Sequence, residues 1–345
     1  MSYDRAASPL QKFGGFLRAN YPLEFVTTLP AELLDGDRRA ALIVLNDLHK
    51  RHGDTIALRG LTLTVPQGAI FALLGPNGCG KTTTIKLLLG MARADSGTGT
   101  VFGLRIDEER ESVAIRQRTG FVSETKELFQ QMDVQTTIRL VRSYYPRWDA
   151  ALERRLLNEF ALTSNKKTSA LSKGMRAKLA LLVACCRGAD LLVLDEPTDG
   201  LDPAAAEQLL ETLVSMVAET GLTVLLSSHQ LHEVERVADG LAIMRDGAVV
   251  LHGELDELRA RVRRVEVRRP VDQATCERVT LANASLFVPD GSTVIHSTLS
   301  DDGGSLLVRG EADEVASHYA ALGAEVSVHA VPLRELFLTL TNVRA

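Results

Sequence analysis

Between about residues 41 and 253, short apolar runs alternate with longer segments in which apolar residues recur at helical spacing. Continuous short apolar runs are typical of strands buried on both faces of a parallel sheet. The expected strands are Ile43–Leu45, Leu61–Val65, Ala69–Leu74, Leu191–Leu194 and Val224–Leu226. The expected helices are Thr82–Leu89, Met175–Cys186 and Ala204–Glu219. This alternation predicts an α/β domain over residues 41–253.

Two further regions differ from this pattern. Residues 133–168 have polar-faced helical patterns without a strand, and they predict a helical lobe over about residues 125–187. The chain then becomes dense in arginine, and residues 254–264 are expected to form a linker. Residues 265–345 predict a small α+β accessory domain. Its expected strands are Ser285–Val288, Thr293–His296, Ser305–Val308 and Glu325–His329.

The two ends of the chain carry different patterns. Residues 1–40 have no sustained period, and this N-terminal extension is expected to pack on its own domain or to stay partly loose. A short helix that docks on a partner or a membrane surface is the alternative, which Gly14 and Gly15 weaken. At the other end, a helix is expected to contribute one apolar face to the core, formed by Leu333, Leu336, Phe337 and Leu340.

Composition narrows the range of functions. The 345 residues include 39 Lys and Arg against 44 Asp and Glu, and the resulting charge of −5 disfavours broad nucleic-acid binding. The arginine-rich stretch 259–269 is a local exception, with a solvated connector, anionic lipid or nucleic acid as alternative explanations. Four cysteines lack metal-ligand spacing, and no apolar run approaches the roughly 18–20 residues of a membrane span. With no secretory signal visible, we expect a cytosolic protein.

Gly75-Pro-Asn-Gly-Cys-Gly-Lys81-Thr82 matches the pattern G-x-x-x-x-G-K-[ST] between an expected strand and an expected helix. Glycines let backbone N–H groups turn inward around an anion, and the helix N-terminus adds its positive dipole end. Lys81 is expected to neutralise the β- and γ-phosphates, and Thr82 to ligate Mg²⁺. Cys79 contributes only its amide. The expected phosphate-binding residues are Gly75, Pro76, Asn77, Gly78, Cys79, Gly80, Lys81, Thr82 and Thr83.

A second motif places two carboxylates directly after the apolar strand at Leu191–Leu194. Carboxyl ends of parallel strands meet at one edge of a sheet, so Asp195 and Glu196 are expected beside the phosphate loop, residues 75–82. Asp195 would hold Mg²⁺ through water, and Glu196 would orient and polarise the attacking water. An Asp-Glu pair alone is weak evidence, but the phosphate loop makes it specific.

Over residues 41–253 the sequence resembles the ATP-binding subunits of ABC transporters, because further family motifs follow in order. Leu171-Ser-Lys-Gly-Met175 stands where the family has its signature loop, and Asp199-Gly-Leu-Asp202 resembles the loop that touches the opposite subunit. Ser227-Ser-His229 resembles the switch histidine, and His52 stands where the family places an aromatic residue that stacks on adenine. The resemblance implies a P-loop NTPase core of the ABC type, with ATP and Mg²⁺ as ligands.

The residues themselves support these roles. Ser172 and the Gly174 amide begin a helix and form a second anion-binding N-terminus. One chain cannot easily aim two such termini at one phosphate, so this one should serve a partner's nucleotide across a two-fold interface. His229 would hydrogen-bond the γ-phosphate and hold the water together with Glu196. The flat imidazole of His52 is expected to form a small adenine shelf.

The sequence departs from the family pattern in two places. Glu124 replaces a glutamine that usually ligates Mg²⁺, and it either takes over as a ligand or points into solvent while a water substitutes. In the signature loop, Lys173 and Met175 replace Gly and Gln. These changes predict a reduced but real ATPase activity. Similar loops, together with an ending like Pro332–Leu340, occur in ATPases paired with ABC-2-type exporters.

The resulting expectation is an ATPase that dimerises around two Mg-ATP, as a homodimer or heterodimer, and drives the separate transmembrane permease of an exporter. It would lie in the cytoplasm, peripheral on the inner face of the cell membrane, with no nucleic-acid partner. A soluble ABC ATPase that acts on nucleic acid or ribosomes is the alternative. A catalytically inactive regulatory module is opposed by the retained residues Lys81, Thr82, Asp195, Glu196 and His229.

Overall fold

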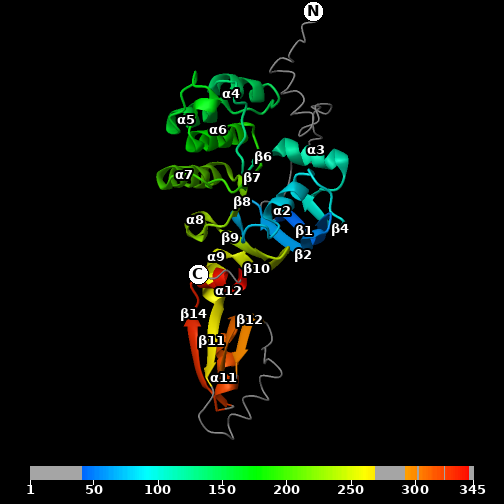
Figure 1. The fold of residues 1–345 in the computed structure, drawn as a ribbon, viewed down its shortest axis with the longest axis vertical. Helices are drawn as coiled ribbons and strands as arrows, with labels where there is room; N and C mark the ends of the chain where they lie inside the picture. Colours follow the sequence, from blue (N-terminus) through cyan, green and yellow to red (C-terminus); the bar gives the residue numbers. More distant parts are fainter. Residues whose placement is uncertain (1–40, 269–291, 301–302, 322, 342–345) are drawn as a thin grey trace, which may run out of the picture.

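The computed structural model describes residues 41–268, 292–300, 303–321 and 323–341. In these residues, a four-stranded and a six-stranded sheet form the main body of the protein together with their helices. A third sheet extends away from this body (Figure 1). The expected strand Ser285–Val288 and the N-terminal extension, residues 1–40, lie outside the described residues. Within the described residues, no helix has the length and apolarity that crossing a bilayer requires.

The central sheet has six strands in the order β10-β9-β3-β8-β7-β6. Five of them are parallel, and β10 is added antiparallel at one edge. Every residue of β3 and β7 is buried, as their uninterrupted apolar sequences predict. The strands are β3 (Ile70–Leu74), β6 (Thr119–Val122), β7 (Leu191–Asp195), β8 (Thr223–Ser228), β9 (Gly240–Arg245) and β10 (Ala248–Glu254).

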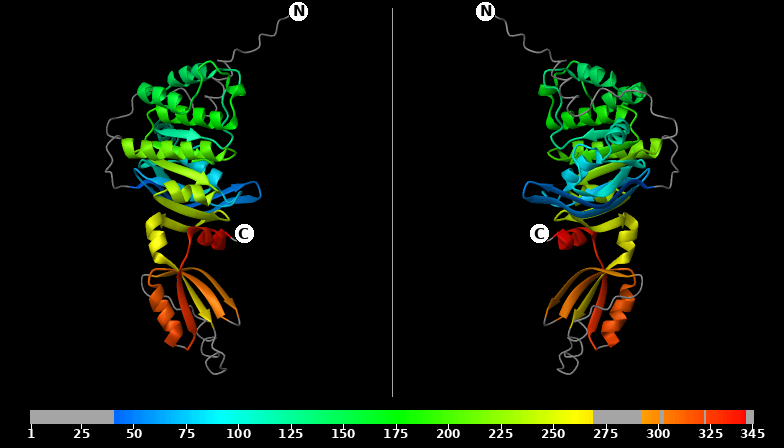
Figure 2. Two further views of the ribbon diagram at one scale, coloured as in Figure 1. Left: turned by 90° about the vertical axis from the view of Figure 1, so that its left-hand side faces the viewer. Right: turned by 90° about the vertical axis from the view of Figure 1, so that its right-hand side faces the viewer.

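A second, antiparallel sheet has the order β2-β1-β4-β5 and packs against one side of the central sheet through α2. It is built on a long hairpin whose tip projects from the body (Figure 2). The elements here are β1 (Ala41–His52), β2 (Thr55–Pro66), β4 (Ser96–Val101), β5 (Leu104–Arg105), α2 (Lys81–Leu88) and α3 (Glu109–Arg118). Phe71 and Leu73 of β3 point into this side of the core.

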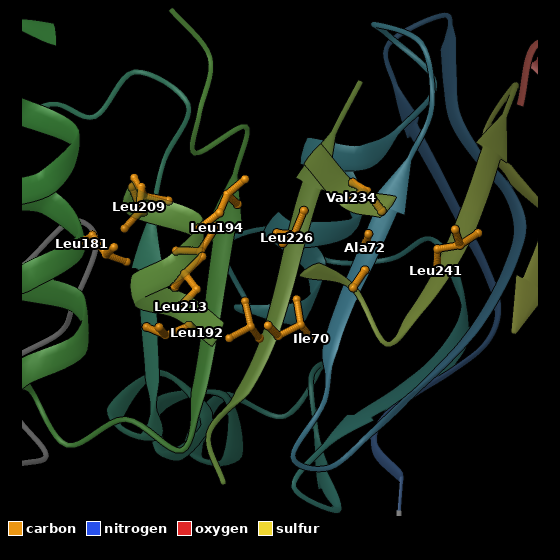
Figure 3. Packing of buried hydrophobic residues seen from close by; sticks show 14 of the residues in the cluster. Ile70, Ala72, Leu181, Leu192, Leu194, Leu209, Leu213, Leu226, Val234 and Leu241 are labelled. Atoms are coloured by element: carbon orange, nitrogen blue, oxygen red, sulfur yellow. The ribbon is translucent and has the colours of Figure 1, made fainter. Parts of the chain in front are cut away.

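The opposite face of the central sheet is covered by α6, α7 and α8 (Figure 3). Side chains alternate along a strand, so Ile70, Ala72 and Leu74 of β3 pack against these helices. Phe71 and Leu73 of the same strand face the antiparallel sheet and α2. The covering helices are α6 (Lys173–Cys186), α7 (Pro203–Thr220) and α8 (Leu231–Val237). The sheet is therefore buried on both faces, which gives the α/β architecture predicted from the sequence.

The packing of α7 leads to a first prediction. Leu213 is 0% exposed and lies between α7 and β7, whereas its neighbour Val214 is 41% exposed. Replacing Leu213 with Ala leaves a cavity and is expected to lower the free energy of unfolding by about 2–5 kcal/mol. The Val214→Ala control should change it by about 0.5 kcal/mol or less. Urea unfolding measures both, and equal effects would contradict the packing described here.

The helical lobe lies at the top of Figure 1 and contains α4 (Val134–Arg142), α5 (Ala150–Glu159), a 3-10 turn (Thr168–Ala170) and α6. Polar side chains fix where its helices begin. Asp133 accepts a hydrogen bond from the Thr136 amide, and Asp149 accepts two from the first turn of α5. The lobe's sequence thus folds as helices without a strand, as its pattern predicts.

The third sheet has the order β12-β13-β11-β14 and carries α11 on one face. Its elements are α9 (Leu255–Arg261), β11 (Val262–Arg268), β12 (Thr293–Ser300), β13 (Gly303–Arg309), α11 (Ala312–Ala321), β14 (Glu325–Ala330) and α12 (Leu333–Thr341). The stretch interpreted as a linker, 254–264, instead contains a helix and the start of β11, because Leu255, Leu258 and Val262 are buried.

The last helix, α12, returns from the third sheet to pack against β9 and α8 (Figures 1 and 2). Leu336 and Leu340 join the same hydrophobic cluster as the central sheet, and Arg245 donates a 2.8 Å hydrogen bond to the Leu340 carbonyl. The apolar face of α12 is buried, as expected, but it belongs to the hydrophobic core around the central sheet. The described part of residues 265–345 therefore does not form an isolated unit.

Candidate active site

The phosphate loop joins β3 to α2, and its path depends on two glycines. A Cβ at Gly75 would come within 2.7 Å of the Met244 carbonyl oxygen. Gly80 is in the left-handed region with φ 111°, and a Cβ there would come within 2.7 Å of the Ala57 carbonyl oxygen. Because a side chain at either position would clash, the loop can pass close to Met244 and Ala57 before α2 begins.

Lys81 is held within this loop although its ammonium is charged. The side chain is 6% exposed, and Nζ donates a 2.7 Å hydrogen bond to the Gly75 carbonyl. Nζ also lies 3.2 Å from Oε1 of Glu196, a carboxylate that is itself 8% exposed. The structure therefore places the two residues of the separate sequence motifs in one buried ion pair.

Asp195 is the centre of a second set of contacts at the end of β7. Its Oδ2 accepts a 2.9 Å hydrogen bond from the Thr82 hydroxyl, and its Oδ1 accepts one of 2.7 Å from the Ser227 hydroxyl. The Ser227 hydroxyl in turn accepts from the Glu196 amide at 2.9 Å. Parallel pairing of β7 with β8 produces this meeting, because Asp195 and Ser227 are register partners. Ser227 was not singled out on its own from the sequence.

Glu196 follows immediately and adopts an unusual backbone conformation, with φ 47°. Its Oε2 lies 2.8 Å from Nδ1 of His229 and also accepts a hydrogen bond from the His229 amide at 3.3 Å. Lys81, Glu196 and His229 thus form one connected row. The His229 side chain is 39% exposed at the outer end of that row, so a reactant can reach it.

Lys126, which sequence reasoning missed, occupies the loop after β6. It is 7% exposed, and its Nζ donates to the carbonyls of Glu124, Glu196 and Asp199 at 3.3, 3.0 and 3.3 Å. Burial lowers the pKa of Lys126; the Asp199 carboxylate opposes this shift, and the Lys173 cation reinforces it. The side chain of Glu124 is exposed, so among the described contacts only its carbonyl joins this group.

Ser172 caps α6 by accepting a 3.2 Å hydrogen bond from the Met175 amide. Beside it, Gly174 lies against Ala205, and Lys173 lies across Gly200. The signature loop, residues 171–175, is therefore packed on the 199–202 loop of its own chain. It belongs to the helical lobe, whereas the phosphate loop begins α2 beside the sheets, so the chain does not bring the two together (Figure 1).

His52 and Cys79 complete the predicted set. His52 is exposed beside the tip of the β1–β2 hairpin, where it pairs with Thr55, and the same hairpin passes the phosphate loop at Ala57. Burial raises the pKa of the Cys79 thiol, while the Lys81 cation opposes the shift. That Cys79 contributes its amide alone to phosphate binding stays a prediction.

Comparisons with known proteins bear on the family and the fold. Residues 58–199 match the family model described as ABC transporter. The chain is 33% identical over 311 residues to a Nod factor export ATP-binding protein I of Cupriavidus pinatubonensis, covering 88% of this chain and 91% of the relative. A protein of that name from Burkholderia orbicola is 40% identical over 222 residues, covering 62% of this chain and 71% of the relative.

Solved structures show the same fold. The structure of an ATP-binding subunit of an ABC transporter is 32% identical and has a TM-score of 0.57, covering 64% of this chain and 92% of that one. A dimeric bacterial ABC transporter cassette is 22% identical with a TM-score of 0.56, covering 62% of this chain and 98% of that one. The predicted fold and family are confirmed: the chain is an ATPase that belongs to the family of ABC transporter ATP-binding proteins.

Proposed function

We propose that this ATPase dimerises around two ATP molecules and drives a separate membrane permease that exports its substrate. The observation that carries the proposal is the connected row Lys81–Glu196–His229 beside the phosphate loop, in which Lys81 and Glu196 are buried. In this row Lys81 is a cation that can bind phosphate, Glu196 is a base, and His229 is a polar group that reaches the surface. Hydrolysis of a terminal phosphoryl group needs such a cation and such a base close together. The names of the two Nod factor export relatives support an exporter.

Thr82 and Asp195 fit a Mg²⁺ ion. Their oxygens are 2.9 Å apart at the phosphate loop, and hydroxyl and carboxylate oxygens are the donors that Mg²⁺ prefers. In the described part of the chain, no group of three or more His, Cys, Asp or Glu residues forms a metal cage, which suits an ion whose remaining ligands are phosphates and water. When bound, Mg²⁺ would neutralise charge on the phosphate oxygens. Whether Glu124 adds a ligand stays a prediction.

Hydrolysis follows from the positions of Glu196 and His229. ATP attracts the Lys81 ammonium to its phosphates, which releases the Oε1 oxygen of Glu196. That carboxylate then orients a water molecule and accepts its proton as the water attacks the γ-phosphorus and the bond to ADP breaks. His229 holds the other carboxylate oxygen, so the free one points at the water.

Dimerisation supplies the second half of the site. Ser172 and Gly174 lie away from the phosphate loop of their own chain, so we assign them to the γ-phosphate bound by a partner subunit. The 199–202 loop, on which they pack, would then lie at the same interface. His52 is assigned to adenine. The dimeric state of the solved cassette supports the dimer itself.

The helical lobe, entered through residues 123–131, is proposed to contact the permease, which places the protein at the inner face of the membrane. The nucleic-acid alternative loses support because several of the described arginines in residues 259–268 contact groups of their own chain. Arg259 and Arg261 each lie 3.7 Å from a carboxylate of their own helix, and Arg264 forms an ion pair with Glu335 of α12. Their contacts suit a connector between the third sheet and the ATPase.

The experiment that tests the proposal is purification of the tagged protein from detergent-solubilised membranes. We expect a co-purifying polypeptide with several apolar spans of about 20 residues each, and release of hydrolysis products that depends on Mg²⁺. Co-purification of RNA that is lost as salt rises would instead favour the soluble alternative.

His229 gives a prediction for the chemical step. Replacing it with Ala removes the 2.8 Å contact to Glu196 Oε2 and is expected to lower kcat by about tenfold to a hundredfold. ATP affinity should change by less than about threefold, because His229 lies beyond the phosphate loop. His232→Ala, an exposed neighbour, is the control. Steady-state hydrolysis and equilibrium binding separate the two effects, and loss of affinity alone would contradict the assigned role.

A further inference from the structure

Lys126 is a buried cation with every donor in use. An ammonium carries three N–H groups, and those of Lys126 meet the carbonyls of Glu196, Glu124 and Asp199 at 3.0, 3.3 and 3.3 Å. Removing such a charge from water is costly unless its partners are well placed. A lysine at this position is therefore more than a solvated loop residue.

The three carbonyls belong to three different functional segments. Glu124 lies in the loop that leads from β6 into the helical lobe, Glu196 directly follows β7, and Asp199 begins the 199–202 loop. The Glu196 carbonyl also accepts the Asp199 amide at 3.2 Å, so it serves two donors. Lys126 thus joins the lobe entrance and the 199–202 loop at the backbone of Glu196.

The backbone at this junction is strained. Lys126 has φ 49° and Glu196 has φ 47°, values that residues with a Cβ rarely adopt. Such conformations are costly in free energy and persist only where surrounding contacts hold them. At Glu196 the conformation directs the carboxylate so that Oε1 meets Lys81 and Oε2 meets His229. The Lys126 hydrogen bond to the Glu196 carbonyl is one of the contacts that hold it.

We propose that Lys126 is a positioning residue for hydrolysis, which fixes the backbone of Glu196 and ties it to the helical-lobe entrance and to Asp199. It does so through backbone carbonyls alone and does not touch the reacting atoms. The proposal rests on the hydrolytic role of Glu196 given above. It adds a link through which a movement of the lobe or of the 199–202 loop reaches the carboxylate.

The test compares Lys126→Met and Lys126→Arg with the control Lys167→Met, the same change at an exposed lysine of the helical lobe. Hydrolysis is measured per bound nucleotide, so that unfolded molecules are not counted. In Lys126→Met we expect kcat per site to fall at least about tenfold while the ATP dissociation constant changes by less than about threefold. Lys126→Arg keeps N–H donors and should recover a substantial part of the rate.

An unchanged kcat per site in Lys126→Met would overturn the proposal, and so would equal losses in the Met and Arg variants, since those indicate packing alone. Lys126→Gln is measured in parallel. If the Met variant does not fold, the kcat per site of the Gln variant is compared with that of Lys126→Arg in the same way. The wild-type protein separates this proposal from the one before it. If wild type does not hydrolyse ATP, the assigned hydrolytic role fails; if wild type and Lys126→Met hydrolyse equally, only the Lys126 link fails.

Discussion

Replacement of Glu196 with Gln is expected to lower ATP hydrolysis by at least about a hundredfold while ATP still binds. The amide keeps the size of the side chain but cannot accept a proton from water. It also removes the charge that faces Lys81 at 3.2 Å, so the ammonium stays available to phosphate. Hydrolysis is followed by phosphate release under single- and multiple-turnover conditions, with nucleotide binding measured on the same preparation.

Glu211→Gln, an exposed carboxylate on α7, is the matched control and should keep the wild-type rate. Because the substitution blocks the chemical step and leaves binding intact, the variant should also accumulate as an ATP-bound dimer in size-exclusion chromatography. A Glu196→Gln protein that hydrolyses ATP at the wild-type rate would refute the role of this carboxylate.

The second large effect is expected at the other end of the ion pair. Lys81→Ala removes the cation that would contact the phosphates, and it leaves Glu196 buried at 8% exposure without its partner. A charge-assisted contact of this kind contributes about 1.5–3 kcal/mol, so ATP binding should weaken by roughly tenfold to over a hundredfold. Repulsion between the unpaired carboxylate and the phosphates adds to the loss.

Calorimetric titration with Mg-ATP measures this change, and Lys86→Ala on the exposed side of α2 serves as the control. The two variants should behave differently. Lys81→Ala loses affinity and therefore rate, whereas Glu196→Gln loses rate alone. Unchanged affinity in Lys81→Ala would mean that the phosphate loop does not hold the triphosphate through this side chain.

Much of the fold was predictable because the central strands β3 and β7 are apolar along almost their whole length. A strand such as Leu191–Asp195 has no polar alternative face, so its burial follows directly from its residues. The first two strands were underestimated, since β1 runs from Ala41 to His52 and only Ile43–Leu45 was expected. Its second half is polar and partly exposed at the projecting hairpin, and hydrogen bonds with the facing strand define it, which an apolar pattern cannot reveal.

The motif residues of the site were predicted from the sequence, whereas the contacts that link them to other segments were predicted less well. Lys81, Asp195, Glu196 and His229 each stood in a recognisable motif, and parallel strand ends explain why they meet. Lys126 was missed because it lies in a short, polar, charged loop, where burial depends on carbonyls supplied from far along the chain. The docking of α12 was missed for the same reason, since its apolar face alone does not say which core it joins.

The pairing of Lys81 with Glu196 also bears on how readily nucleotide leaves. Lys81 and Glu196 are already each other's counterions, so triphosphate must exchange one attraction for another rather than satisfy a bare cation. The net gain on loading is therefore smaller than the phosphate contacts alone would suggest. Once the terminal phosphate has left, the Glu196 carboxylate can pair with the Lys81 ammonium again. This pairing favours release of ADP and returns the subunit to its starting state.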